Sequence, residues 1–150
     1  MKNFIIIILL ITSNTLFCQK ITTEKIEDFY KIKVYNGIHL ELHKSDENKL
    51  EISGYKSDKI KIKNTEGILR ISLRFPELLA GDKVSVKLFY NKEIQTIDGN
   101  EGSKIVGKGI HQTHLEVKAQ EGASIKLEIK TKHLKVIGSW LVGDNWGLAH

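Results

Sequence analysis

Apolar and polar residues alternate along most of the region between residues 29 and 90, and this alternation constrains the fold more than any other feature. A period of two predicts β-strands with one buried and one solvated face. The segments follow one another at a spacing of roughly ten residues, separated by turn-forming residues such as Asn36-Gly37. Their apolar positions are Phe29, Ile32, Val34, Ile38, Leu40, Leu42, Leu50, Ile52, Ile60, Ile62, Leu69, Ile71, Leu73, Val84, Val86 and Leu88. This spacing predicts an all-β fold, and taken alone it is compatible with a β-sandwich.

Helical periodicity is confined to short segments. Residues 22–30, with three acidic side chains, are the best candidate for a short helix, and residues 76–80 could form a single turn. Neither segment changes the prediction of an all-β fold.

After residue 90 the pattern changes to a repeat of about 20 residues, a period typical of solenoid folds. Apolar segments begin at Ile94, Leu115 and Leu134, and small-residue corners stand at Gly102 and Gly122. A short strand, a corner and a second short strand, repeated in this way, predict the coils of a parallel β-solenoid. Small residues suit such corners because the backbone turns sharply there and stacked coils approach closely. Antiparallel hairpins with glycine turns are the alternative interpretation.

The N-terminus has the order of residues found in a secretory signal peptide: Lys2 is followed by the apolar residues 4–11 and then by polar residues. The apolar run is far shorter than the roughly 20 residues that span a bilayer. We therefore predict a cleaved signal peptide over residues 1–18, no transmembrane anchor after cleavage, and a protein that is periplasmic, on the cell surface or secreted. Lipoprotein anchoring through Cys18 is the less favoured alternative, because Leu16 and Phe17 are bulky. The mature chain then contains no cysteine for a disulfide or a nucleophile.

Lysine supplies nearly all of the positive charge. The chain has 23 Lys and Arg against 18 Asp and Glu, a net charge of +5, and loss of Lys2 with the signal leaves 5 − 1 = +4. Only Arg70 and Arg74 are arginine, whereas nucleic-acid readers rely on arginine, so no nucleic-acid partner is predicted. Lysine-rich strand faces would favour an acidic partner, such as an acidic polysaccharide or a protein on the cell surface; the alternative is that they only keep the chain soluble. The lysines concerned are Lys59, Lys61 and Lys63, and Lys118, Lys126 and Lys130.

Catalytic and metal-binding motifs are weak. The sequence has no Gly-x-Ser-x-Gly elbow, phosphate loop or His-Glu-x-x-His motif. His111 and His114 are close together in a region of strands, which favours surface positions over a metal site. His39 and His43 share a strand face with Glu41, which indicates a solvated face.

Carboxylates are the remaining candidates for chemistry, since polysaccharide lyases and glycosidases that use a β-helix scaffold need clustered carboxylates on one face. Asp98 with Glu101, and Asp46 with Glu47, are each predicted to lie in a turn, where acidic residues are common. The sequence therefore predicts no enzyme and no catalytic, cofactor-binding or metal-binding residues. A carbohydrate-active enzyme on the same scaffold is the alternative.

A series of loose motifs follows in a fixed order and spacing: Phe29-Tyr30-Lys31-Ile32-Lys33-Val34, Gly37-Ile38-His39-Leu40-Glu41-Leu42, Leu50-Glu51-Ile52-Ser53-Gly54, Gly67-Ile68-Leu69-Arg70-Ile71, Val84-Ser85-Val86, Gly102-Ser103 and Gly122-Ala123-Ser124. Over residues 25–139 the chain resembles the putative autotransporter adhesin, head GIN domain family of exported Bacteroidetes proteins. The resemblance implies an all-β, right-handed parallel β-helix, export and a role in adhesion, and it brings no catalytic residues.

The chain departs from the family pattern at two places. His39 stands where the family has Asn, and the pattern of corners stops at Gly138-Ser139. We interpret this stop as a C-terminal truncation; the alternative is that Trp140 and Trp146 cap the open end of the solenoid. The predicted organisation is a signal peptide over 1–18, a head-GIN-like β domain over 19–139 and an atypical tail over 140–150. The predicted function is that of an exported surface or periplasmic adhesin-like binding or scaffold protein.

Overall fold

The computed structural model describes residues 21–54, 57–74 and 84–138. Within these residues the chain forms one ten-stranded sheet and a single turn of 3-10 helix at Ser57–Lys59, so the all-β prediction is confirmed. The strands are β1 (Thr22–Lys25), β2 (Lys31–Val34), β3 (His39–Lys44), β4 (Lys49–Ser53), β5 (Ile60–Thr65), β6 (Ile68–Leu73), β7 (Ser85–Tyr90), β8 (Thr96–Gly99), β9 (Lys104–Ala119) and β10 (Ser124–Gly138). The predicted signal peptide, the turn at 76–80 and the tail at 140–150 lie outside the described residues.

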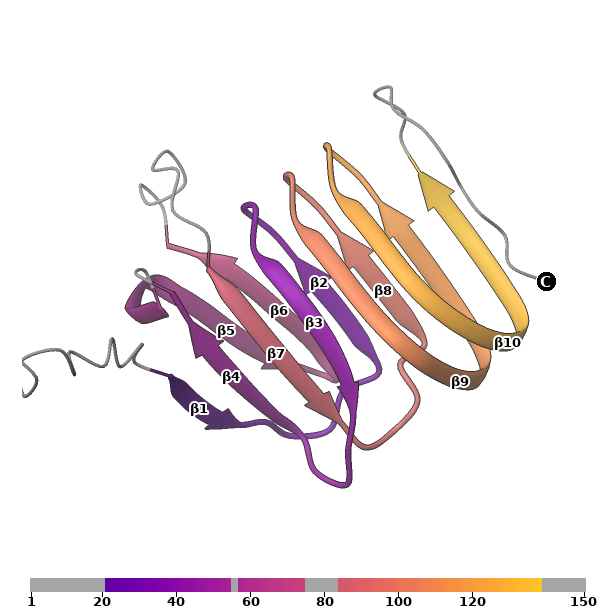
Figure 1. Ribbon diagram of the computed structural model, residues 1–150, viewed down its shortest axis with the longest axis horizontal. Coiled ribbons are helices and arrows are strands. Elements are labelled where there is room, and N and C mark those ends of the chain that lie inside the picture. The colour runs from indigo at the N-terminus through magenta and orange to yellow at the C-terminus, as the bar shows by residue number, and fades with distance from the viewer. Residues whose placement is uncertain (1–20, 55–56, 75–83, 139–150) are drawn as a thin grey trace, which may run out of the picture.

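The sheet curls over on itself, so that two layers face each other (Figure 1). The front layer contains β1, β4, β7 and β3, and the back layer contains β5, β6, β2 and β8. β9 and β10 bend in the middle and belong to both layers: the start of β9 pairs with β3 and its end pairs with β8. Two long bent strands thus stand where the sequence predicted separate short ones.

Parallel pairing in register organises most of the sheet. β2 lies between β6 and β8, and β3 lies between β7 and β9, all parallel. β10 runs parallel to β9, with Ser124 opposite Lys104. The repeat of about 20 residues in the sequence is therefore the length of chain between one strand and the strand stacked beside it. The alternative interpretation of residues 104–138 as antiparallel hairpins is wrong, because β9 and β10 pair in parallel. Antiparallel pairs occur at the two ends of the strand order: β1 with β4 and β4 with β7 at one end, and β5 with β6 at the other.

Three corners of one conformation carry the chain from the back layer to the front layer: Asn36-Gly37, Glu101-Gly102 and Glu121-Gly122. Both residues of each corner have φ between 50° and 77°, the left-handed conformation of a type I′ turn. The corners also stack, because the Gly37 N–H donates to the Glu101 carbonyl at 2.8 Å and the Gly102 N–H donates to the Glu121 carbonyl at 2.9 Å. The glycine corners predicted at Gly102 and Gly122 are confirmed.

The core lies between the two layers and follows the predicted alternation. Ile32, Leu40 and Ile97 are fully buried, and the alternation of burial along β2 and β3 follows the apolar positions. Burial of each such side chain stabilises the fold by about 1.5–3 kcal/mol. The core residues are Phe29, Ile32, Val34, Ile38, Leu40, Leu42, Leu50, Ile52, Leu69, Ile71, Val84, Val86, Leu88, Tyr90, Ile94, Ile97, Ile105, Ile110, Leu115 and Val117.

The helix predicted for residues 22–30 is wrong. Thr22–Lys25 forms β1, which pairs antiparallel with β4 through partners such as Glu24 and Leu50. Hydrogen bonds to the edge of an existing sheet decide the conformation of this short segment, whose own helical preference is weak.

Candidate binding face

The outward positions of β5, β6 and β2 bring cationic side chains together. The register places Lys63 beside Arg70, and Arg70 beside Lys33, in one row across the three strands. Lys61 and Lys31 lie two positions before Lys63 and Lys33 and therefore point to the same side of the sheet. These five residues are called the cationic face below.

Acidic residues are absent from β5, β6 and β2 themselves. Lys61 and Lys63 are exposed, and Lys31, Lys33 and Arg70 are partly exposed. Neighbouring strands are about 4.8 Å apart and alternate residues of one strand about 6.6 Å apart. Five positive charges at such spacing generate a local positive potential that attracts anions.

Asp98 on β8 lies at the border of the cationic face. Its Oδ2 is 3.5 Å from Lys33 Nζ, and its Oδ1 accepts a hydrogen bond from Asn100 Nδ2 at 3.0 Å. Asp98 is only 4% exposed, so it serves as a buried counter-charge for this side of the row. The prediction that Asp98 and Glu101 share a turn is wrong for Asp98, which lies within a strand opposite Lys33; Glu101 alone occupies the corner.

The structure separates the second predicted group of lysines. Lys118 extends the row in the back layer beyond Asp98, whereas Lys126 pairs with Val106 in the front layer. Lys130 lies opposite His111, near the bend of the two long strands. The first group is partly retained, since Lys61 and Lys63 belong to the cationic face and Lys59 ends the preceding 3-10 turn. The members that sequence reasoning missed are Lys31, Lys33 and Arg70.

The outward face of the front layer carries charges of both signs. Lys87 lies between Glu51 and Glu41 in one row, and Lys49 forms ion pairs with Glu51 at 3.5 Å and Glu47 at 3.6 Å. Opposite charges in neighbouring strands neutralise one another, so this face offers less net charge to a partner.

Aromatic contacts also occupy the outward side of the front layer. Lys49 Nζ lies 4.8 Å from the centre of the Phe89 ring, and the His43 ring stacks on Phe89 at 5.2 Å between centroids. The side chains of His39 and His43 are 36% and 43% exposed beside Glu41, which confirms the predicted solvated strand face.

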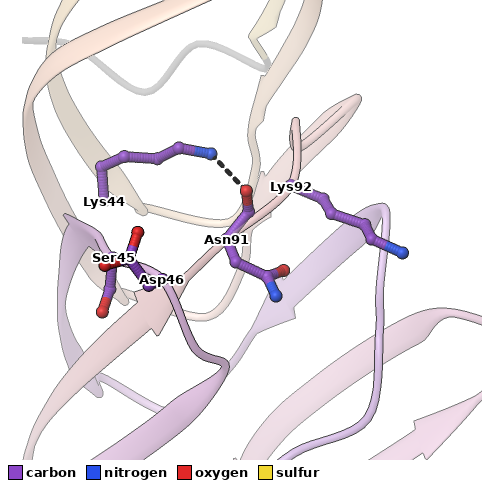
Figure 2. A pocket seen from close by; sticks show the side chains of 5 residues that line it. All are labelled: Lys44, Ser45, Asp46, Asn91 and Lys92. Atoms are coloured by element: carbon purple, nitrogen blue, oxygen red, sulfur yellow. Dashed lines mark hydrogen bonds between the residues drawn. The ribbon is translucent and has the colours of Figure 1, made fainter.

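An open hollow of about 560 Å³ lies where β3 and β7 end (Figure 2). Lys44, Ser45, Asp46, Asn91 and Lys92 line it. Lys44 Nζ reaches across the hollow and donates to the Asn91 carbonyl at 2.7 Å, as the dashed line in Figure 2 shows. The hollow gathers two lysines and one carboxylate, and Asp46 stands in the turn predicted for it.

A second hollow, of about 430 Å³, lies beside the ends of β9 and β10. The rings of His114 and His133 stack there at 4.7 Å between centroids. Glu116 accepts from Lys135 at 3.0 Å and from Lys118 at 3.1 Å, and these two hydrogen bonds lower the pKa of Glu116 below its usual value. The contacts tie β9 to β10 at the surface.

Clustered metal ligands and membrane-spanning helices are both missing from residues 21–54, 57–74 and 84–138. No three His, Cys, Asp or Glu side chains there could jointly hold a metal ion. No helix within the same residues is long and apolar enough to cross a bilayer. The two pairs of carboxylates considered for catalysis lie in different parts of the fold. Asp98 is buried against Lys33 and Glu101 is in a corner, whereas Asp46 lines the first hollow and its neighbour Glu47 lies 3.6 Å from Lys49.

Comparison with known families decides the relationship that the motifs suggested. The sequence matches the family described as "Putative auto-transporter adhesin, head GIN domain" over residues 28–139. The chain belongs to this family. The resemblance read from the sequence over residues 25–139 is confirmed at nearly the same boundaries. No relative was found among the curated proteins.

Solved structures with the fold of this head GIN domain include three from the genera Bacteroides and Parabacteroides. A putative adhesin from Bacteroides fragilis is 14% identical with a TM-score of 0.59, over 79% of this chain and 60% of that one. A putative adhesin from Parabacteroides merdae is 15% identical with a TM-score of 0.58, over 77% and 53%. A putative lipid binding protein from Parabacteroides distasonis is 13% identical with a TM-score of 0.55, over 82% and 68%. At these identities the likeness establishes the fold alone, and the chain spans little more than half the length of the two adhesins.

Proposed function

We propose that this head GIN domain is an exported, adhesin-like binding protein of the cell surface or periplasm, and that its cationic face binds an acidic polysaccharide. The observation that carries the proposal is the cationic face itself: five Lys and Arg side chains on three adjacent strands that contain no acidic residue. The family description, an adhesin, supports binding rather than catalysis.

The shape of the cationic face favours a linear polymer over a compact ligand. The face is an exposed sheet surface, and the two hollows described above lie elsewhere. A polysaccharide with a carboxylate on successive sugars can contact several cations at once, and linked weak contacts give a higher overall affinity than any one of them. Arg70, near the centre of the row, can form a bidentate pair with a carboxylate.

We propose further that the mature domain is a right-handed parallel β-helix that begins after removal of a signal peptide at residues 1–18. Stacked corners and parallel strands that pair one repeat apart support the β-helix. Intact mass of the protein purified from its native envelope tests the export step. The mass of a chain that begins at Gln19 supports simple cleavage, and the mass of the full-length chain contradicts removal of a signal peptide. A lipid increment on a chain that begins at Cys18 replaces simple cleavage with lipoprotein anchoring.

Binding of polygalacturonate, with neutral dextran as the comparison, tests the proposed ligand class. One variant neutralises the cationic face with Lys61→Gln, Lys63→Gln and Arg70→Gln. A matched control removes three lysines from the front face with Lys87→Gln, Lys104→Gln and Lys126→Gln, so both variants lose three positive charges. Isothermal titration calorimetry at low salt would measure both dissociation constants.

We expect the cationic-face variant to bind polygalacturonate on the order of 100-fold more weakly than the unmodified chain, because each of the three cations contributes about 1 kcal/mol near a polyanionic surface. The control should change affinity no more than about threefold, and added salt should weaken binding. Equal losses in the two variants, or equal binding to dextran, would overturn the proposal.

A further inference from the structure

An exposed tyrosine lies at the boundary of the cationic face. Tyr30 directly precedes Lys31, the first residue of β2, and it is 43% exposed. No other Phe, Tyr or Trp is as exposed among residues 21–54, 57–74 and 84–138. Tyrosine is enriched at binding surfaces because its ring offers a large, rigid contact area with a polar end.

The turn between β5 and β6 fixes the position of the Tyr30 ring. A Cβ on Gly67 would lie 2.6 Å from Tyr30 Cδ1 and 2.7 Å from Tyr30 Cε1, so the ring fits there because Gly67 has no side chain. The Tyr30 N–H donates to the Gly67 carbonyl at 2.9 Å, and the Tyr30 carbonyl accepts from the Gln95 N–H at 2.8 Å. A ring that is already held in place loses little conformational freedom when a ligand packs on it.

The cationic face is partly apolar at this end. The register pairs Lys31 with Ile68, which is partly exposed. Arg70 lies two positions beyond Ile68 on the same side of β6, about 6.6 Å along the strand. A ligand that combines anionic groups with apolar surface could therefore use both kinds of contact, whereas a polyanion without apolar surface would use the charges alone.

We propose that Tyr30 determines the specificity of the cationic face by stacking against the C–H face of a uronic acid ring, while carboxylates of the same polymer contact Lys31 and Arg70. Pyranose rings have a face of C–H groups that can pack on an aromatic ring, and their carboxylates project from the edge. The inference rests on the proposed function and narrows it: the sugar ring is recognised as well as the charge.

Isothermal titration calorimetry with two polymers tests the inference. Polygalacturonate has sugar rings, and polyglutamate is a polyanion without them. Tyr30→Leu removes the aromatic ring and keeps apolar bulk, and Tyr30→Phe keeps the ring. The matched control Phe89→Leu removes a partly exposed ring from the front layer.

We expect Tyr30→Leu to bind polygalacturonate about 2- to 10-fold more weakly than the unmodified chain, as for the loss of one aromatic contact. Its affinity for polyglutamate should not change, and Tyr30→Phe and Phe89→Leu should bind both polymers like the unmodified chain. The salt dependence of binding should also be unchanged in Tyr30→Leu, because the ring displaces no counterions, and should weaken in the cationic-face variant.

Unchanged affinity of Tyr30→Leu for polygalacturonate, or an equal loss for both polymers, would overturn the inference. The proposed function would still stand if the cationic-face variant had lost affinity in the same experiment, whereas both would fall if the unmodified chain did not bind polygalacturonate. NMR of the unmodified chain with oligogalacturonate is a second measurement that needs no variant to fold. Sugar protons that stack on a ring should shift upfield, and unshifted protons would contradict the stacking.

Discussion

β9 and β10 run parallel along their length with matching apolar positions, yet they differ in burial. β9 has a neighbouring strand on each side, and its Ile110 and Leu115 are each 2% exposed; Ile129 and Leu134, their partners on β10, are partly buried and 41% exposed. The same alternation therefore yields a core strand or an edge strand according to what lies beside it. The side chains of a stacked strand are buried largely by its neighbours.

Truncation of equivalent leucines should give the largest contrast between the two strands. Leu115→Ala removes a fully packed side chain and should lower the free energy of unfolding by about 2–5 kcal/mol. Leu134→Ala should cost at least about 1 kcal/mol less, because Leu134 is far more exposed than Leu115. Urea denaturation of both variants measures the difference. Equal costs would show that the edge position is as well packed as the interior one.

A second contrast between β9 and β10 is the paired position of Gly107 and Leu127. Gly107 on β9 has no side chain, whereas its partner on β10, Leu127, has a large one. A Cβ on Gly107 would lie 3.0 Å from Ile110 Cδ1, 3.1 Å from Leu127 Cδ2 and 3.2 Å from Leu42 Cβ. We expect Gly107→Ala to cost about 1–3 kcal/mol through overpacking. The double variant Gly107→Ala with Leu127→Ala should lose less stability than the sum of the two single variants, since the new methyl occupies space vacated by Leu127. Additive losses in thermal denaturation would count against this packing.

The corners that precede β9 and β10 should respond alike to substitution. Gly102 and Gly122 have φ of 68° and 77°, and a Cβ on either would meet no atom within 4 Å. Gly102→Ala and Gly122→Ala should therefore each cost about 1–2 kcal/mol, from the left-handed backbone conformation alone. A difference between them of more than about 1 kcal/mol in chemical denaturation would mean that the corners are not equivalent.

The ion pair between the two strands, formed by Lys135 and Glu116, should give the smallest effect. The hydrogen bond from Lys135 on β10, and then that from Lys118 on β9, lower the pKa of Glu116. A carboxyl group whose pKa is lowered on folding stabilises the folded state at pH values above its ordinary, unfolded-state pKa. This contribution is lost as the pH falls through the folded-state pKa. Lys135→Met should raise the pKa of Glu116 in an NMR titration, and the control Lys130→Met should not. An unchanged pKa in the Lys135 variant would show that this contact is not held in solution.

Features encoded by a few consecutive residues could be predicted from the sequence. The alternation marked the inward positions of the strands, and the glycine dipeptides marked corners whose positive φ glycine adopts at little cost. The cationic face could not be predicted in full. Arg70 and Lys33 are far apart in the sequence and become neighbours only through the register of β6 and β2. Lys118 and Lys126 look close in sequence but are separated by a corner that sends them to opposite layers.

Asp98 shows the same limit. Asp98 is followed by Gly99 and Asn100, residue types that are common in turns, so local preference alone predicts a turn there. The residue lies in β8 because strands on both sides supply its hydrogen-bond partners, and Lys33, from a distant part of the sequence, supplies its counter-charge. Long-range pairing decides both its conformation and its role.

The central claim is that the strands stack in parallel and in register. The exposed edge at β10 and the extension of the cationic row to Lys118 both depend on it. A pair of cysteines introduced into the mature chain tests it directly. Ser124→Cys with Lys104→Cys places the thiols on directly paired residues of parallel strands, at a separation that permits a disulfide. Val117→Cys with Lys126→Cys places them in opposite layers, about 10 Å apart, but an antiparallel hairpin at Glu121-Gly122 would bring them together. We predict rapid oxidation of the first pair and little of the second, measured by mass spectrometry; the reverse result would contradict the stacked arrangement.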